Sequence, residues 1–271
     1  MMRRFRSGRV AAKAHDDLHT PAIGRFVPSG LTLLGLCSGT TAIRFALMGN
    51  WKAAVIAIVI AAVLDTMDGR IARMLGADSK FGAQLDSLAD LVSFGIAPSV
   101  LVYMWTLNQA GGAGWTIALV FCVCCAIRLA RFNIETVEAE DREDANSRFT
   151  GVPTPAAACM ILLPMLLSFQ FKGTLAGHWL SDPILNGGVV SAVSLLMVSR
   201  LPTFSFKNFH LPRKLLPLAV LAAAGIVTLA VLWPWATLSG GLILYIMTLP
   251  LGARPRSERR RFFARHTPPA E

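Results

Sequence analysis

Residues 64–90 read LDTMDGRIARMLGADSKFGAQLDSLAD and contain four aspartates at helical spacing. Five positions spaced i, i+3, i+4, i+7 and i+8 share one helical face: Asp65, Asp68, Gly69, Ala72 and Arg73. Three more repeat every four residues and share one face of a second helix: Gly82, Asp86 and Asp90. The short polar link 74–81 allows the two helices to turn back on each other. We therefore expect four carboxylates to meet in one cleft.

The residue types on these two faces predict the ligand. Four carboxylates beside lipid must take up protons or bind cations, and oxygen ligands suit a hard divalent ion such as Mg²⁺ or Mn²⁺. Small side chains at Gly69, Ala72 and Gly82 leave room for a large ligand. The guanidinium of Arg73 is suited to phosphate oxygens. The stretch therefore predicts a site for a metal-bound diphosphate. A polar hairpin that only caps two membrane helices would not explain the glycines.

The pattern D-x2-D-G-x2-A-R-x8-G-x3-D-x3-D resembles the signature of the CDP-alcohol phosphotransferase family, and all eight fixed positions match. The resemblance implies one or two divalent ions, Mg²⁺ or Mn²⁺, bound by the four aspartates Asp65, Asp68, Asp86 and Asp90. It implies that Asp90 is also the catalytic base. Contacts to CDP-diacylglycerol are implied for seven residues: Thr32, Asp68, Gly69, Ala72, Arg73, Ser79 and Gly82. Thr32 ends the stretch PSGLT (28–32), which lacks the Asn of the family's P-N-x-x-T.

Three further stretches resemble the bacterial phosphatidylserine synthases of this family: FGAQLDSLADLVSFGIAP (81–98), RLARFN (128–133) and FTGVPTPAAA (149–158). That resemblance implies transfer of the phosphatidyl group from CDP-diacylglycerol to L-serine, with release of CMP, by a homodimer. Our hypothesis is that Arg128 or Arg131 binds the serine carboxylate, with Asn133 near the serine ammonium group. The alternative is that both arginines anchor a helix end at lipid headgroups.

Two other functions remain open at this stage. The acceptor could be a different alcohol, as in the phosphatidylglycerophosphate, phosphatidylinositol phosphate and phosphatidylcholine synthases of the family. From another class, carboxylates within a membrane could mark a cation transporter. No internal repeat is evident in the sequence, and the aspartates cluster beside Arg73 and glycines rather than standing alone.

Composition predicts an all-α polytopic membrane protein. Of 271 residues, 54% are hydrophobic and 15% charged, well below the roughly 25% charged residues of a soluble protein. Apolar runs predict about eight spans, namely a six-helix core and two additional C-terminal helices. The expected parts are a basic tail (1–27), a catalytic core (28–200), an interfacial linker with the last two helices (201–252) and a basic tail (253–271).

The distribution of the net charge of +10 predicts the orientation. With the N-terminus in the cytosol, only Lys52 and Lys172 of the 26 lysines and arginines fall in outer loops, and Arg44 falls within a span. Both termini and the aspartates then face the cytosol of a bacterial inner membrane. The segment 134–150, rich in acids, is expected to be a solvated polar loop.

Overall fold

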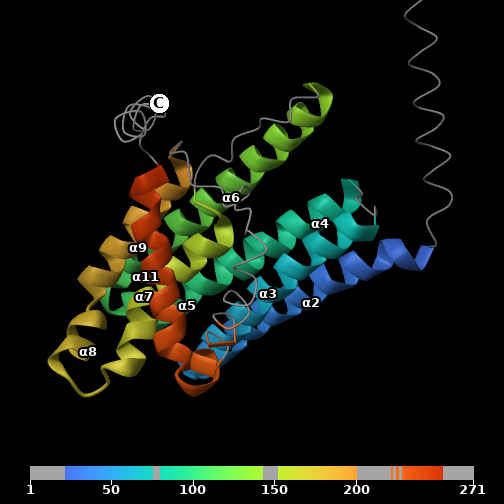
Figure 1. The fold of residues 1–271 in the computed structure, drawn as a ribbon. Coiled ribbons are helices and arrows are strands. Elements are labelled where there is room, and N and C mark those ends of the chain that lie inside the picture. The colour runs from blue at the N-terminus through green and yellow to red at the C-terminus, as the bar shows by residue number, and fades with distance from the viewer. Residues whose placement is uncertain are drawn as a thin grey trace, which may run out of the picture. The chain divides into compact units, whose positions relative to one another are not determined.

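The structure, a computed structural model, describes residues 22–75, 80–142, 152–199 and 228–252, together with residues 221, 224 and 225. Every regular element within these ranges is a helix (Figure 1), which confirms the all-α prediction. Contacts group the chain into two compact units, which meet between Trp105 and Thr106 in the sequence. The tails 1–21 and 253–271, Ser79 and the linker 201–214 lie outside the described residues.

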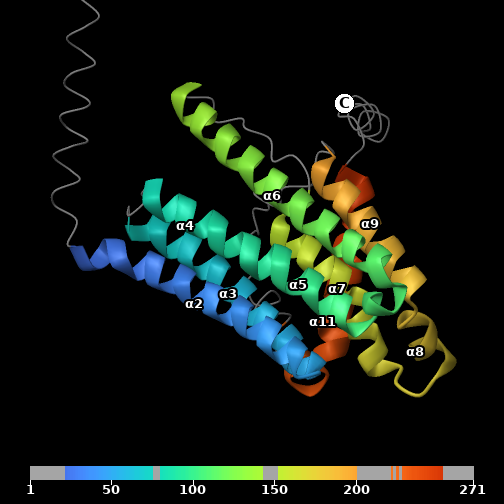
Figure 2. The ribbon, with the colours of Figure 1, turned by 180° about the vertical axis from the view of Figure 1, so that it is seen from behind.

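The described residues of the first unit form five helical elements. They are α2 (Ala22–Leu47), α3 (Trp51–Leu75), α4 (Lys80–Asp90), the π-helix η1 (Leu91–Ile96) and α5 (Ala97–Trp105). Helices α2 and α3 form an antiparallel hairpin (Figure 2) around a tight turn in which Gly49 has φ +69°. That left-handed conformation suits glycine, and the Asn50 side chain accepts a hydrogen bond from the Ala53 N–H at the start of α3.

Helix α2 begins earlier than the sequence suggested. The expected first segment opened with Pro28, but the helix starts at Ala22 and Pro28 lies inside it. Proline lacks a backbone N–H, which removes one helical hydrogen bond without preventing the helix from continuing. Part of the expected N-terminal tail is therefore helical.

Pro98 perturbs its helix upstream of itself. A proline ring clashes with the carbonyl of the residue four positions earlier, which here is Phe94. The chain accommodates this by widening into η1, where the Ala97 N–H donates to the Val92 carbonyl five residues back. The segment before Pro98 is thus a π-helical turn directly after Asp90.

The second unit begins with the 3₁₀-helix η2 (Leu107–Ala110) and continues with α6 (Gly111–Arg142) and α7 (Thr154–Gln170). It is completed by α8 (Leu175–Leu180), α9 (Pro183–Val198) and α11 (Pro234–Gly252). The expected loop over 134–150 is wrong for its first part, because α6 continues without interruption to Arg142. Residues 134–142 contain no glycine or proline, and three of these nine residues are glutamates, which favour the helix.

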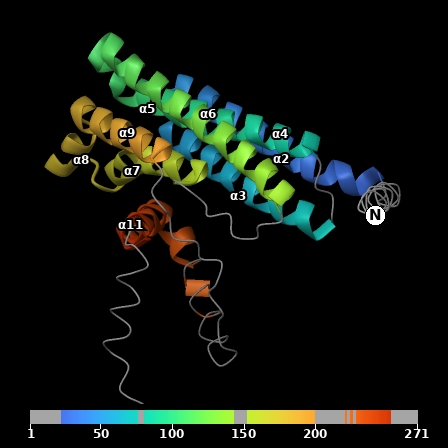
Figure 3. The same cartoon turned by 90° about the horizontal axis from the view of Figure 1, so that it is seen from above.

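Within this second unit, α9 packs along α6 and α11 packs against α7 (Figure 3). Two contacts fix the α7–α11 pair near the end of α7. Gln170 Nε2 donates to Ser239 Oγ over 2.8 Å, and the rings of Phe169 and Trp235 meet edge to face with centroids 5.0 Å apart. The last described helix therefore belongs to the same compact unit as the core helices before it.

Three described segments are long and apolar enough to cross a membrane: Pro28–Leu47, Phe81–Trp105 and Leu107–Glu135. Shorter apolar helices cover Thr154–Gln170, Pro183–Val198 and Pro234–Met247. The chain is therefore an integral membrane protein. The number of eight spans stays a prediction, since one of the expected segments (215–232) falls mostly outside the described residues.

Candidate functional site

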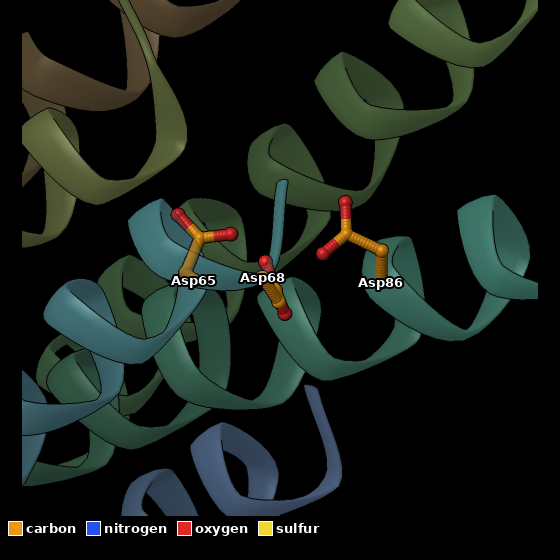
Figure 4. A group of neighbouring side chains, drawn as sticks. All are labelled: Asp65, Asp68 and Asp86. Carbon is orange, nitrogen blue, oxygen red and sulfur yellow. The ribbon is translucent and has the colours of Figure 1, made fainter. Parts of the chain in front are cut away.

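Three aspartate carboxylates converge in the first unit. Asp65 and Asp68 project from α3 and Asp86 from α4 (Figure 4), and one oxygen from each lies within 4.8 Å of the other two. The spacing along each helix puts these residues on facing surfaces, as the sequence predicted. The meeting of the two faces is confirmed for these three carboxylates.

Asp90 holds a different position from the other three. It lies one turn after Asp86, lines the same pocket and hydrogen-bonds with the Asp65 side chain. Two neighbouring carboxylates repel each other, and a bound cation would relieve that repulsion. The structure thus separates a group of three carboxylates from a fourth that is paired with Asp65.

Helix α2 supplies the third wall of the pocket. Thr32 is 7% exposed and its Oγ1 donates to Asp68 Oδ2 over 2.7 Å; the same oxygen lies 3.0 Å from the Pro28 carbonyl oxygen. A hydroxyl that donates to a carboxylate fixes the rotamer of that carboxylate. Thr32 therefore orients Asp68, which is only 4% exposed.

The rest of the pocket wall is mostly apolar, with three small residues, one serine and one phenylalanine. In addition to the four aspartates and Thr32, the pocket is lined by Gly35, Ala61, Ala89, Ser93 and Phe94. An oxygen-only donor set with three convergent carboxylates fits a hard divalent cation such as Mg²⁺ or Mn²⁺. Low-dielectric walls strengthen the attraction between such a cation and its ligands.

A model of the CDP-alcohol phosphatidyltransferase family matches residues 25–249, which is most of the chain. The chain belongs to this family. Its site is thus carried on α2, α3 and α4, all of them within the matched region.

Individual relatives agree with the family assignment. The chain is 35% identical to a CDP-diacylglycerol–serine O-phosphatidyltransferase of Mycobacterium leprae over 250 residues, which cover 89% of this chain and 82% of the relative. It is 36% identical to the protein of the same name from Mycobacterium tuberculosis, with the same coverage. A shorter relative with this name, from Bacillus subtilis, is 35% identical over 68% of this chain and 92% of its own length.

The nucleotide-contact residues implied by the family resemblance lie near the acidic pocket but do not all line it. Gly69, Ala72, Arg73 and Gly82 are not among the described lining residues. Arg73 is exposed, and its Nε donates to the Gly69 carbonyl oxygen one turn earlier over 2.8 Å. A Cβ added at Gly69 meets no described atom within 4 Å, so the surface beside Asp68 is open.

The residues expected to bind serine belong to the second unit. Arg128 Nη1 donates to Thr154 Oγ1 at the start of α7 over 3.2 Å, and Arg131 Nη1 donates to the Val198 carbonyl at the end of α9 over 3.1 Å. Both arginines thus tie α6 to neighbouring helices. Asn133 is half-buried, one turn before the end of the apolar part of α6.

Sequence reasoning missed the contribution of Gly35 and Ser93 to the pocket. Ser93 follows Asp86 and Asp90 by seven and three residues, and Gly35 follows Thr32 by three. Both therefore continue a helical face that already carried site residues, which is the signal that points to them.

Proposed function

We infer that the protein transfers the phosphatidyl group of CDP-diacylglycerol to the hydroxyl of L-serine, giving phosphatidylserine and CMP. The observation that carries this is the convergence of Asp65, Asp68 and Asp86 beside Asp90. Family membership supplies the reaction class. The names of relatives that align over most of the chain support serine as the acceptor.

In this reaction the serine hydroxyl oxygen forms a bond to the phosphorus that carries diacylglycerol. The bond from that phosphorus to the bridging oxygen breaks, and CMP leaves with the electron pair. Asp90 is proposed to accept the hydroxyl proton, with Asp65 holding its carboxyl group in place. A bound divalent ion, when present, neutralises diphosphate charge and makes the hydroxyl more acidic.

We propose that Asp65, Asp68 and Asp86 form the main cation site, and that Asp90 joins it from the Asp65 side. Thr32 then acts by orienting Asp68 rather than by touching the nucleotide. The proposed position of the CDP moiety is along this end of α3, which the open space at Gly69 and the exposed guanidinium of Arg73 support, with Ala72, Gly82 and Ser79 nearby in the sequence. Whether one or two ions bind, and whether they are Mg²⁺ or Mn²⁺, is for metal titration to decide.

For serine, we propose recognition by Arg128 with Arg131 and Asn133. Arg128 is only partly exposed, and a bidentate contact with a carboxylate is the strongest pairing its guanidinium forms. The hydrogen bonds to Thr154 and Val198 also fit the alternative, in which the arginines join helix ends. The two roles predict different kinetic effects.

The proposed setting is the cytoplasmic membrane of a bacterium, with the aspartates and both termini toward the cytosol, because basic residues concentrate at that side. A homodimer remains an expectation from the family resemblance. Crosslinking of the purified protein in detergent or nanodiscs measures it.

The deciding experiment is an acceptor screen. Purified protein receives CDP-diacylglycerol and one acceptor at a time, namely L-serine, glycerol 3-phosphate, inositol phosphate or choline, with Mn²⁺ or Mg²⁺. We expect a product with the mass of phosphatidylserine and serine-dependent CMP release, both abolished by EDTA. A product with another acceptor would reassign the substrate. CMP release that no acceptor stimulates would indicate hydrolysis by water, and no CMP release with any acceptor would reject group transfer and favour the transporter alternative.

A further inference from the structure

Helix α2 lies very close to η1 at Gly39 and Ser93, and Ser93 lines the acidic pocket. A Cβ built on Gly39 of α2 would overlap Ser93 Oγ and stand 2.7 Å from Ser93 Cα and 2.8 Å from Ser93 Cβ. Carbon atoms in contact are normally about 3.5–4.0 Å apart. The backbone of η1 therefore rests against α2 in a space that only glycine leaves open.

The same contact includes a hydrogen bond. Ser93 is 2% exposed, and its Oγ donates to the Gly35 carbonyl oxygen one turn before Gly39, over 3.3 Å. In this way one α2 face, through Gly35 and Gly39, holds η1. Asp90 immediately precedes η1, so a shift of η1 moves the Asp90 backbone with it.

Helix α2 also holds α3, which carries the other acids. Thr32 Oγ1 donates to Asp68 Oδ2 over 2.7 Å, and Ser38 Oγ donates to the Ala57 carbonyl oxygen over 2.7 Å. One helix thus has polar contacts with both acid-bearing partners. Its spacing to each of them fixes how far Asp90 stands from Asp65.

We propose that Gly39 and Ser93 are positioning residues for the site: their close contact sets the distance of Asp90 from the carboxylates of α3. The proposal rests on the function proposed above for its kinetic consequence, but not for its effect on cation binding. Ser93 also lines the acidic pocket, whereas Gly39 does not. Both act through the place they give to the π-helical turn after Asp90.

The size of the effect follows from the geometry. Moving a Cβ from 2.7 Å to an ordinary contact with Ser93 requires a displacement of about 1 Å. A misplacement of about 1 Å in a catalytic group can cost on the order of 100-fold in rate. Gly39→Ala is therefore expected to weaken Mn²⁺ binding at least 10-fold and to lower kcat at least 30-fold.

The test compares four variants with wild type in detergent. Mn²⁺ binding is measured by electron paramagnetic resonance without substrate, and kcat and KM are measured at saturating Mn²⁺. At Gly30, on the same helix, an added Cβ meets no described atom within 4 Å, so Gly30→Ala is the matched control. Gly39→Ala combined with Ser93→Gly leaves the contact with Ser93 Cα in place and loses the hydrogen bond to Gly35, so this double variant should still bind Mn²⁺ at least five-fold more weakly than wild type.

Ser93→Ala is the milder variant should Gly39→Ala fail to fold. It loses the hydrogen bond to Gly35 without adding bulk, and we expect Mn²⁺ affinity to fall about ten-fold, the lower end of the range known for residues that support metal ligands. KM for CDP-diacylglycerol should change less than three-fold in every variant.

Wild-type Mn²⁺ affinity in Gly39→Ala, or in Ser93→Ala where the former does not fold, overturns the proposal. An equal loss in Gly30→Ala, or wild-type Mn²⁺ affinity in the double variant, overturns it as well. Wild-type protein that binds Mn²⁺ but releases no CMP with serine would instead count against the proposed function, because the binding measurement does not depend on it.

Discussion

Replacing Thr32 with valine should weaken cation binding without unfolding the protein. Valine has nearly the shape of threonine, so the buried position stays filled, but the 2.7 Å hydrogen bond to Asp68 Oδ2 is lost. The Asp68 carboxylate is then free to leave the orientation in which it faces Asp65 and Asp86. It also loses a donor that favours its ionised form, the form that binds a cation.

A hydrogen bond to a charged group contributes about 1.5–3 kcal/mol, and each 1.4 kcal/mol is a factor of ten. If the Thr32–Asp68 hydrogen bond stabilises only the cation-bound protein, its loss raises the Mn²⁺ concentration for half-maximal activity about 10- to 100-fold. Residues that orient metal ligands give losses of the same size when they are replaced. Thr32→Ser retains the hydroxyl and should stay within about three-fold of wild type.

The assay is CMP release from CDP-diacylglycerol and serine across a Mn²⁺ titration, with thermal unfolding measured in parallel. Thr40→Val is the matched control, because Thr40 makes the same kind of bond to a carbonyl four residues back, on the exposed side of α2. A Mn²⁺ midpoint in Thr32→Val within two-fold of Thr40→Val would refute the assigned role. A change confined to the KM for serine would refute it too.

Three further outcomes follow from the site. Asp90→Asn should lower turnover by about 10²–10⁴-fold, the usual contribution of a general base. The affinity for CDP-diacylglycerol should stay within a few-fold of wild type. Substantial activity of this variant would reject the base assignment. Gly69→Ala should fold normally because its Cβ meets no described atom within 4 Å. It should nevertheless raise KM for CDP-diacylglycerol about 10-fold, which corresponds to about 1.4 kcal/mol. An unchanged KM would show that Gly69 does not contact the CDP moiety. Arg128→Ala should raise KM for serine far more than KM for CDP-diacylglycerol. Thr154→Val removes the same hydrogen bond and should not have this effect. Equal effects of Arg128→Ala on both constants would favour the helix-anchor role.

The meeting of the two acidic faces could be predicted because it depends on local periodicity. Aspartates spaced by three or four residues share a helical face wherever the helix forms. Because the link 74–81 between the two helices is short, two such faces are expected to lie close together. The first three aspartates lie together for that reason. The separate place of Asp90 beside Asp65 depends on tertiary distances that no spacing encodes.

The sequence also could not reveal helix boundaries that depend on the surrounding structure rather than on local residue preferences. Pro28 was expected to open α2, and the acids after Asn133 were expected to form a loop, but the chain is helical through both. Proline disfavours a helix interior without forbidding it, and acidic residues are good helix formers outside lipid. Composition indicates where a segment becomes polar, which differs from where its helix stops.

The role of α2 shows why the signature stretch alone does not make the site. The acids come from α3 and α4, but the hydrogen bond that orients Asp68 and the contact that seats η1 both come from α2. Asp68 and Asp90 are attached to different helices, so their separation depends on how each helix packs against this common neighbour. Because the cluster holds like charges, it would spread apart if that packing loosened. The geometry of the acidic pocket is therefore set by the residues that bring α2 close, Thr32, Gly35 and Gly39, as much as by the aspartates themselves.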